Sequence, residues 1–295
     1  MNLQKLVKEY LVECAMRNYS LETITQRGYA LNRFIEYVGN KDAETISRSD
    51  VKGYLLLCKD TMKASTVNSL LRHLNGVFSY AAEERYIEVN PCDSIKNLKE
   101  EKTVIRTYSS STIQSVLENL EKLDFTSVRN KAIVILLIET GIRNSEVCDI
   151  KLDDISDGCI KIHGKGNKIR YVPITEHFKV ALDNYMRSRN SFLGDRECEY
   201  LFISRLGKGL TTQSLRKTIK ENVFNGLDEI DGIATTVHNF RRFFAQNMLD
   251  NVDLYTVSRL MGHENINTTE RYLRSAESSA IVARGMNSPL TKLYR

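Results

Sequence analysis

The sequence has no apolar run long enough to cross a bilayer, no internal repeat and no tract of low complexity. Its apolar stretches fall short of the roughly 18 consecutive residues that a membrane-spanning helix needs. The first 14 residues lack the apolar centre of a secretory signal peptide. A hydrophobic content of 42% with 27% charged residues is ordinary for a globular protein and does not indicate disorder. We therefore expect a cytoplasmic protein without a membrane partner.

The sequence also lacks a recognisable pattern of metal ligands or disulfides. Its cysteines occur without CxxC or Cys/His spacing, which favours reduced thiols over disulfides or zinc ligands. They are Cys14, Cys58, Cys92, Cys148, Cys159 and Cys198. We predict no metal site and no cofactor. The net charge of +5 is mildly basic, which is compatible with a nucleic-acid partner but too common to identify one.

Residues 1–94 predict a bundle of four helices. The helices begin near Leu3, after Ser20 as an N-cap, at Asp50 and at Ser65, and each has apolar positions at helical spacing. The predicted buried stripe of the second helix is Ile24, Tyr29, Leu31, Phe34 and Ile35. The basic side chains of this region fit a solvated surface as well as they fit DNA contacts. These are Lys63, Arg72, His73 and Lys96.

Residues 95–107 are polar and charged without an apolar period, so we interpret them as a linker to a second domain, residues 108–295. That domain is predicted to be mainly helical with a small antiparallel sheet, which makes the whole chain mostly α in an α+β arrangement. Asn130–Glu139 is apolar almost all round, as expected for a helix at the centre of a core. Cys159–His163 and Ile169–Ile174 alternate around a glycine-containing turn, which predicts a β-hairpin.

Two segments of the second domain are basic. The hairpin contains cationic side chains and no acid between Gly158 and Thr175, a pattern suited to a DNA groove. Tyr200–Ile203 predicts a short strand, and Thr211–Val223 predicts a helix with a basic face. The candidate DNA contacts are Lys161, Lys168, Arg170, Arg216, Lys217 and Lys220. A solvated turn and a charged outer face are the alternatives for these segments.

Near the C-terminus, four side chains occur in the order His238, Arg241, His263 and Tyr272. His238 and Arg241 are one turn apart at the start of a predicted helix, where free N–H groups favour an anion. His263 directly follows Gly262, a residue suited to ending a helix. The four side chains therefore predict a site for a phosphate.

The order His-x-x-Arg, Leu-Met-Gly-His and Thr-Thr-x-x-Tyr resembles the C-terminal signature of the tyrosine recombinase (phage integrase) family. Residues 139–146, ETGIRNSE, are similar to a second motif of that family and place Arg143 after a turn. Residues 164–168, GKGNK, are similar to the turn of its lysine-bearing hairpin. Any one motif is weak, but three in the family's order indicate a two-domain, Xer-like or integrase-like member.

The resemblance implies a role for each matching side chain. Guanidinium groups are planar and permanently charged, and they can donate two hydrogen bonds to phosphate oxygens. The implied catalytic set is Arg143, Lys165, His238, Arg241, His263 and the nucleophile Tyr272, with Glu146 in a supporting role. His238 is also a candidate proton acceptor. Lys165 is the implied general acid, and the neighbouring Lys168 is an alternative for that role.

The implied function is site-specific DNA recombination through a covalent 3′-phosphotyrosyl intermediate, in integration, excision or inversion of a mobile element. The implied partners are double-stranded recombination sites, further copies of the chain in a homo-tetramer, and accessory DNA-bending proteins. Residues 1–94 would be the core-binding domain that clamps the DNA. A type IB topoisomerase and a non-catalytic DNA-binding relative are the alternatives. Dependence on a specific site and a tetrameric complex would separate a recombinase from a topoisomerase.

Overall fold

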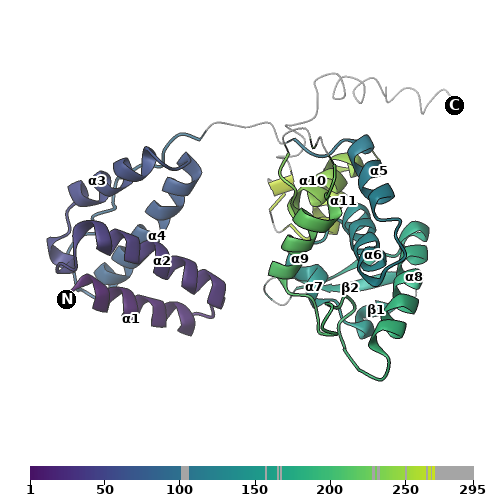
Figure 1. Cartoon of the computed structure of the whole chain (residues 1–295). Helices are drawn as coiled ribbons and strands as arrows, with labels where there is room; N and C mark the ends of the chain where they lie inside the picture. The colour runs from purple at the N-terminus through teal and green to yellow at the C-terminus, as the bar shows by residue number, and fades with distance from the viewer. Residues whose placement is uncertain are drawn as a thin grey trace, which may run out of the picture. The chain divides into compact units, whose positions relative to one another are not determined.

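The computed structural model describes residues 1–100, 106–156, 158–164, 166, 168–227, 230, 233–249, 251–263, 265, 266, 268 and 269. The chain divides into two compact units, Met1–Thr103 and Val104–Arg295, and each is described by itself (Figure 1). Several residues named above lie outside the described part. They are Lys165, Tyr272, residues 101–105 of the predicted linker and residues 270–295 of the predicted second domain.

The first unit is a bundle of four α-helices around one apolar core. These are α1 (Leu3–Met16), α2 (Leu21–Val38), α3 (Arg48–Lys59) and α4 (Ala64–Glu83), with a 3₁₀ turn η1 (Ala43–Thr45). The predicted N-cap Ser20 accepts a hydrogen bond from the Thr23 amide. A capping box between Ser47 and Asp50 starts α3 two residues before the predicted position. The long helix α4 packs against α1, α2 and α3.

The predicted buried stripe of α2 is wrong at Tyr29, which is 71% exposed. The buried positions of α2 include Gly28, Leu31 and Ile35, which follow one another at spacings of three and four. Tyr29 lies one residue after Gly28 and is therefore rotated away from the core. An added Cβ at Gly28 would be 3.4 Å from Leu11 of α1, an ordinary van der Waals distance, so α1 and α2 pack against each other at this position.

The start of the segment predicted to be a linker is bound to the first unit. The Leu98 amide donates to Asn68 Oδ1 of α4 over 2.7 Å, and Asn68 Nδ2 donates to the Leu98 carbonyl over 3.0 Å. Ile95 and Leu98 pack against the apolar core of the bundle. At the other end, the Thr107 hydroxyl donates to the Asn239 carbonyl in the second unit. Apolar residues within a polar segment were the sequence signal for this attachment.

The second unit is mainly helical, with α6 at its centre. Its elements are α5 (Ser110–Asn119), α6 (Phe125–Thr140), α7 (Asn144–Asp149), η2 (Leu152–Asp154), α8 (Glu176–Leu193), α9 (Thr212–Thr218), a π-helical segment η3 (Ile219–Val223), α10 (Val237–Met248) and α11 (Leu254–Met261). The side chain of Asp124 caps α6, which begins five residues before the apolar segment. This helix packs against α8 on one side and α10 on another. Because most of its positions are buried, α6 lacks a polar face.

A small antiparallel sheet of β1 (Ile155–Ser156), β2 (Cys159–His163) and β3 (Ile169–Pro173), in that order, completes the second unit. In the hairpin, Ile160 pairs with Val172 and Ile162 pairs with Arg170. Side chains alternate between the faces of a strand, so Arg170 shares the inward face with buried Ile160, Ile162 and Val172. Ile169 and Tyr171 point outward and are exposed. The predicted fold class is confirmed: the protein is mostly α-helical with a small antiparallel sheet.

The predicted strand at Tyr200–Ile203 is wrong, because no continuous ladder forms there. The Leu201 amide donates to the Ile150 carbonyl and the Leu210 amide donates to the Phe202 carbonyl, and side chains of α8 bind other backbone groups of this segment. The Tyr185 hydroxyl donates to the Leu201 carbonyl and accepts from the Ile203 amide. Arg189 Nε also donates to the Leu201 carbonyl. Isolated bridges form at Tyr200 and Ile203 only. The predicted helix that follows is α9 continued by η3, so its second half is π-helical.

Within the described residues, no helix combines the length and the apolar character that crossing a bilayer requires.

Candidate active site

The helix α10 presents two of the predicted site residues on its first turns. His238 is exposed, whereas Arg241, one turn later, is only 3% exposed. The guanidinium of Arg241 donates to the Gly141 carbonyl over 2.5 Å and to the Met261 carbonyl over 2.7 Å. Since these acceptors follow α6 and end α11, Arg241 connects three helices.

A sharp corner between α6 and α7 positions Arg143. Gly141 ends α6 in the left-handed conformation, with φ of +58°. The ring of Phe244 from α10 covers Gly141, where an added Cβ would be only 2.4 Å from Phe244 Cδ1. Arg143 is then the N-cap residue of α7, and its amide donates to Glu146 Oε2 over 2.6 Å. Tight packing on the glycine therefore holds the backbone that carries Arg143.

The end of α11 is held against α10 by a separate apolar cluster of Phe244, Ala245, Leu249, Val257 and Met261. Gly262 ends α11 with φ of +66°, and the amides of Gly262 and His263 donate back to Arg259 and Ser258. This is the Schellman arrangement of a helix C-terminus. His263 therefore leaves the helix at a defined point.

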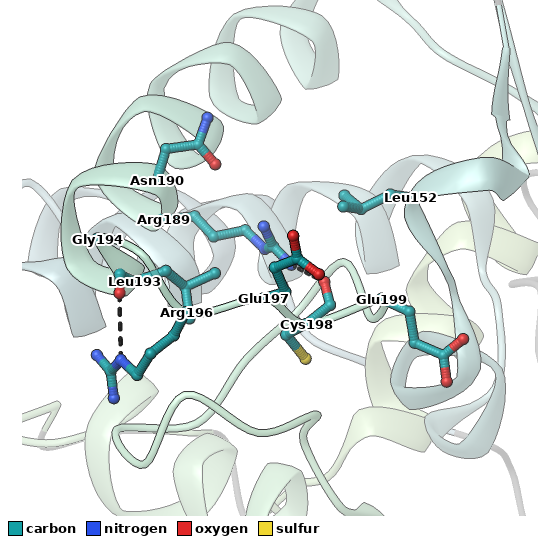
Figure 2. A pocket seen from close by; sticks show the side chains of 9 residues that line it. All are labelled: Leu152, Arg189, Asn190, Leu193, Gly194, Arg196, Glu197, Cys198 and Glu199. Atoms are coloured by element: carbon teal, nitrogen blue, oxygen red, sulfur yellow. Dashed lines mark hydrogen bonds between the residues drawn. The ribbon is translucent and has the colours of Figure 1, made fainter.

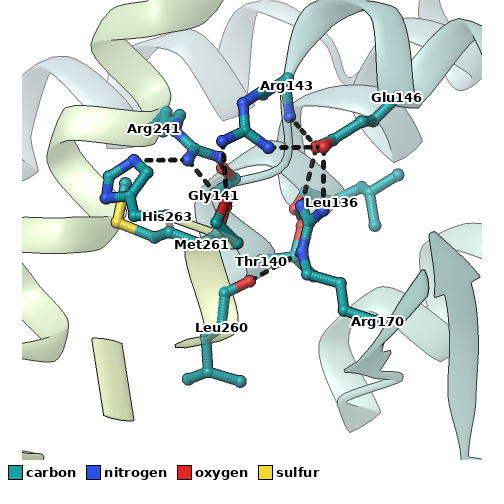
Figure 3. Close-up of polar contacts among 11 residues, drawn as sticks. Leu136, Thr140, Gly141, Arg143, Glu146, Arg170, Arg241, Leu260, Met261 and His263 are labelled. Atoms are coloured by element: carbon teal, nitrogen blue, oxygen red, sulfur yellow. Dashed lines mark hydrogen bonds and ion pairs between the residues drawn. The ribbon is translucent and has the colours of Figure 1, made fainter. Parts of the chain in front are cut away.

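Three arginines from different elements bind three successive carbonyls at this helix end (Figure 3). Arg170 of β3 donates to Leu260 over 3.0 Å, Arg241 of α10 donates to Met261 over 2.7 Å, and Arg143 donates to Gly262 over 2.8 Å. The last carbonyls of a helix have no partner within it, and they carry the negative end of its dipole. They therefore provide a point of negative potential around which the arginines gather.

Glu146 is the carboxylate of the cluster and is buried. Arg170 donates to both of its oxygens, over 2.8 and 2.7 Å, and Arg143 donates to Oε1 over 2.8 Å. Burial acts to raise the pKa of Glu146, but the hydrogen bonds and charge of Arg170, with the hydrogen bonds of Arg143, outweigh burial and lower the pKa to about 2. Glu146 is thus ionised at neutral pH. Three guanidinium groups beside one carboxylate leave an excess of positive charge.

This ion pairing predicts an acid-sensitive contribution to stability. Because the folded-state pKa of about 2 is below the ordinary value of 4.5, the contribution is present above pH 4.5 and is lost as the pH falls toward 2. It amounts to roughly 3 kcal/mol, at about 1.4 kcal/mol for each pKa unit. We expect the free energy of unfolding of the wild type to exceed that of Glu146→Gln by a margin that shrinks across this window. Denaturant unfolding at a series of pH values measures it.

Glu118→Gln, a change at an exposed carboxylate of the same unit, is the matched control. A margin between wild type and Glu146→Gln that stays constant from about pH 5 to about pH 2.5 would contradict the ion pair.

His263 is a hydrogen-bond acceptor and a donor at once. Its Nε2 lies 2.7 Å from a guanidinium nitrogen of Arg241, which can only donate, so Nε2 accepts. Its Nδ1 therefore carries the proton and donates to the Thr269 hydroxyl over 2.7 Å. Burial, followed by the positive charges of neighbouring arginines, foremost Arg241, lowers the pKa of His263 to about 4. In this structure His263 is neutral at pH 7, and its Nε2 is no donor.

The predicted DNA contacts lie in different surroundings. Lys168 is exposed beside the hairpin turn, and Lys161 on β2 is partly buried. The basic side chains of α9 and η3 are all exposed, and Lys217 lies 3.8 Å from Glu221. They are Arg216, Lys217 and Lys220. The guanidinium of Arg170 points inward and binds the carboxylate of Glu146.

Two contacts of the site were not predicted from the sequence. Thr269 is fully buried and binds His263, whereas the sequence shows only its place in the Thr-Thr-x-x-Tyr motif. The inward direction of Arg170 had a sequence signal. It lies two residues from Val172 in an alternating strand, so both side chains belong on one face.

A pocket of about 400 Å³ lies elsewhere, at the C-terminal end of α8 and the loop that follows it (Figure 2). Arg189 and Arg196 in its wall donate to backbone carbonyls, and Arg196 Nε reaches the Leu193 carbonyl over 3.1 Å. None of the residues predicted for catalysis or DNA contact lines this pocket. In the described part of the chain, no three His, Cys, Asp or Glu side chains gather where they could hold a metal ion.

Residues 106–279 match the phage integrase family. The tyrosine recombinase XerC of Lactobacillus leichmannii is 31% identical over 234 residues, which is 78% of each chain. A solved lambda integrase dimer bound to a COC′ core site matches with a TM-score of 0.78 at 17% identity, over 94% of this chain and 97% of that one. A lambda integrase tetramer bound to a Holliday junction matches with a TM-score of 0.77 at 17% identity, over 92% of this chain and 77% of that one.

The family match covers more than half of the chain, and the sequence relative is a recombinase. The chain belongs to the phage integrase family and is a tyrosine-type site-specific DNA recombinase.

Proposed function

We propose that the chain cleaves DNA with Tyr272 as nucleophile, while Arg143 and Arg241 bind the scissile phosphate. The observation that carries this proposal is the convergence of both guanidinium groups on the end of α11, next to His263. Both arginines are bound to backbone carbonyls, so their donors are directed before a substrate arrives. Such fixed donors stabilise the charge that accumulates on non-bridging oxygens during attack.

The reaction balances without a metal or a nucleotide. The phenolate of Tyr272 attacks phosphorus, a P–O bond to the tyrosine forms, and the bond to the 5′-oxygen breaks. Lys165, or Lys168 as the alternative, donates a proton to the departing oxygen. The phosphotyrosine conserves the bond energy, so a 5′-hydroxyl can reverse the step on another strand.

The histidines have distinct roles in this proposal. His238 is exposed at the start of α10, where it can donate to the phosphate or accept the proton of Tyr272. His263 is neutral while Arg241 donates to its Nε2. A bound phosphate brings negative charge, which favours the protonated ring, and Nε2 can then donate to that phosphate.

The proposed assembly extends beyond one chain. We assign residues 1–94 as the core-binding domain, residues 95–107 as the linker and residues 108–295 as the catalytic domain. The basic side chains Lys161, Lys168, Arg216, Lys217 and Lys220 would contact the DNA backbone. Because lambda integrase forms a tetramer on a Holliday junction, we propose a homo-tetramer for this chain on paired recombination sites. Its reaction would serve integration, excision or inversion in the cytoplasm, with accessory DNA-bending proteins.

Trapping on a nicked suicide duplex tests the nucleophile. The duplex is first selected from a random pool by its binding to the protein. We expect the wild type to form a denaturant-resistant adduct at the 3′-phosphate, and Tyr272→Phe to form none, because the phenyl ring has no oxygen to attack with. Gel electrophoresis under denaturing conditions measures the adduct.

Tyr255→Phe is the matched control, since Tyr255 is an exposed tyrosine of α11 that precedes the motif. An adduct that persists in Tyr272→Phe would assign another nucleophile. Tight binding of the selected DNA by the wild type with no adduct would contradict the catalytic assignment itself.

A further inference from the structure

We propose that Arg170 is a positioning residue that joins the β2–β3 hairpin to the end of α11 through the carboxylate of Glu146. We call this arrangement the Arg170 bridge: the ion pair of Arg170 with Glu146 together with the hydrogen bond from Arg170 to Leu260. The inference rests on the catalytic assignment proposed above. It gives Arg170 an internal role in place of the predicted contact with DNA.

The guanidinium of Arg170 uses all three of its nitrogens within the protein (Figure 3). Its terminal nitrogens form two parallel bonds to Glu146, over 2.8 and 2.7 Å, and its Nε binds Leu260 over 3.0 Å. The side chain of Arg170 is 14% exposed and that of Glu146 is 3% exposed. A bidentate pair shielded from water is both strong and directional. The arginine therefore fixes β3 to α7 and α11 at one point.

The bridge lies against the two residues that directly precede proposed catalytic side chains. A Cβ added to Gly164 would be 3.7 Å from the Arg170 guanidinium and 3.9 Å from Glu146 Oε1. A Cβ added to Gly262 would be 3.1 Å from the same guanidinium. Gly164 precedes Lys165, and Gly262 precedes His263. The bridge thus connects the backbone leading to the proposed general acid with the backbone leading to a proposed phosphate ligand.

This geometry indicates that the bridge positions the general acid for the reaction. The proposed general acid, Lys165, lies in the sequence between β2 and β3, and β3 carries Arg170. A small misplacement of a reacting group can cost on the order of 100-fold in rate. By joining the hairpin to α11, Arg170 holds the strand that follows the general acid in a constant position relative to the phosphate site.

The test compares Arg170→Met and Arg170→Lys with the wild type as full chains. We expect Arg170→Met to form the DNA adduct about 10- to 100-fold more slowly at saturating DNA. DNA affinity and its salt dependence are measured in chains that also contain Tyr272→Phe. Adding Arg170→Met to Tyr272→Phe should leave both quantities unchanged. An internal ion pair releases no counterions from DNA, whereas a phosphate contact does.

Lys168→Met supplies the reference for a lost DNA contact at the same hairpin. It should reduce the slope of log affinity against log salt by about one phosphate contact. If Arg170→Met reduces this slope equally and forms the adduct at the wild-type rate on saturating DNA, the bridge is refuted and Arg170 is a DNA contact. Arg170→Lys keeps the charge but loses the fork, so a wild-type cleavage rate in that variant would also refute the bridge.

Histidine NMR on the DNA-free chain provides a readout independent of cleavage. Removal of the Arg170 charge should raise the pKa of His263, and Arg170→Lys should largely restore it. The groups whose charge acts on His263 are Arg241 and His238 of α10, Arg143 at the start of α7, and Arg170 of β3. The carboxylate of Glu146 binds two of them, Arg143 and Arg170. A merely destabilised but folded variant leaves this titration unchanged.

These readouts separate the two proposals. A wild type that forms no adduct contradicts the catalytic assignment. The salt dependence of DNA affinity and the titration of His263 still test the Arg170 bridge in that case. An unchanged His263 titration in Arg170→Met would overturn the bridge even if cleavage falls. If Arg170→Met does not fold, Arg170→Lys decides the question through its cleavage rate.

Discussion

Arg241→Lys should form the DNA adduct about 100- to 1000-fold more slowly than the wild type, the loss typical of removing a fixed donor from a charge-stabilising site. One guanidinium here reaches the carbonyls of Gly141 and Met261 and the ring of His263. A lysine ammonium is a single nitrogen and cannot reach all of them in these directions. Single-turnover kinetics on the suicide duplex at saturating DNA measure the loss.

The same change should lower the free energy of unfolding by about 1–3 kcal/mol, because a buried carbonyl loses its donor. Arg187→Lys is the matched control, since it makes the same substitution at an exposed position of α8. A cleavage rate in Arg241→Lys close to that of Arg187→Lys would show that Arg241 has only a structural role.

Gly141→Ala is expected to have the largest effect on stability. The left-handed conformation at φ +58° costs an alanine about 1–2 kcal/mol. Its Cβ would also be 2.4 Å from Phe244 Cδ1, and overpacking of a core typically adds about 1–3 kcal/mol. We expect the melting temperature of the second unit to fall by on the order of 10 °C. Calorimetry or circular dichroism measures the change.

Gly158→Ala separates the two causes. Gly158 has φ of +83°, and no described atom lies within 4 Å of an added Cβ there. This variant should show the backbone cost alone. Equal destabilisation by the two substitutions would mean that Phe244 moves aside without cost, and that the corner before Arg143 is less tightly packed than the structure indicates.

Local patterns in the sequence were enough to predict most of the elements around the site. Apolar periodicity and caps located α10 and α11, and the glycine turn located the β2–β3 hairpin. These features depend on neighbours within a few residues, so the sequence contains them directly. The predicted strand at Tyr200–Ile203 failed because side chains of α8 bind part of its backbone, which leaves single bridges in place of a continuous ladder.

By itself, the sequence determined the order of the motifs, the helices that carry them and the family to which the chain belongs. Only the tertiary structure decided what each arginine binds. Three basic residues illustrate this: Arg143, Arg170 and Arg241. Each of them donates to a different carbonyl at the end of α11. Arg143 and Arg170 also bind Glu146 of α7. Two of these pairs lie far apart in the chain: Arg143 and Gly262 are separated by 119 residues, and Arg170 and Leu260 by 90. No local pattern encodes such a pairing, because it depends on how apolar packing brings the elements together.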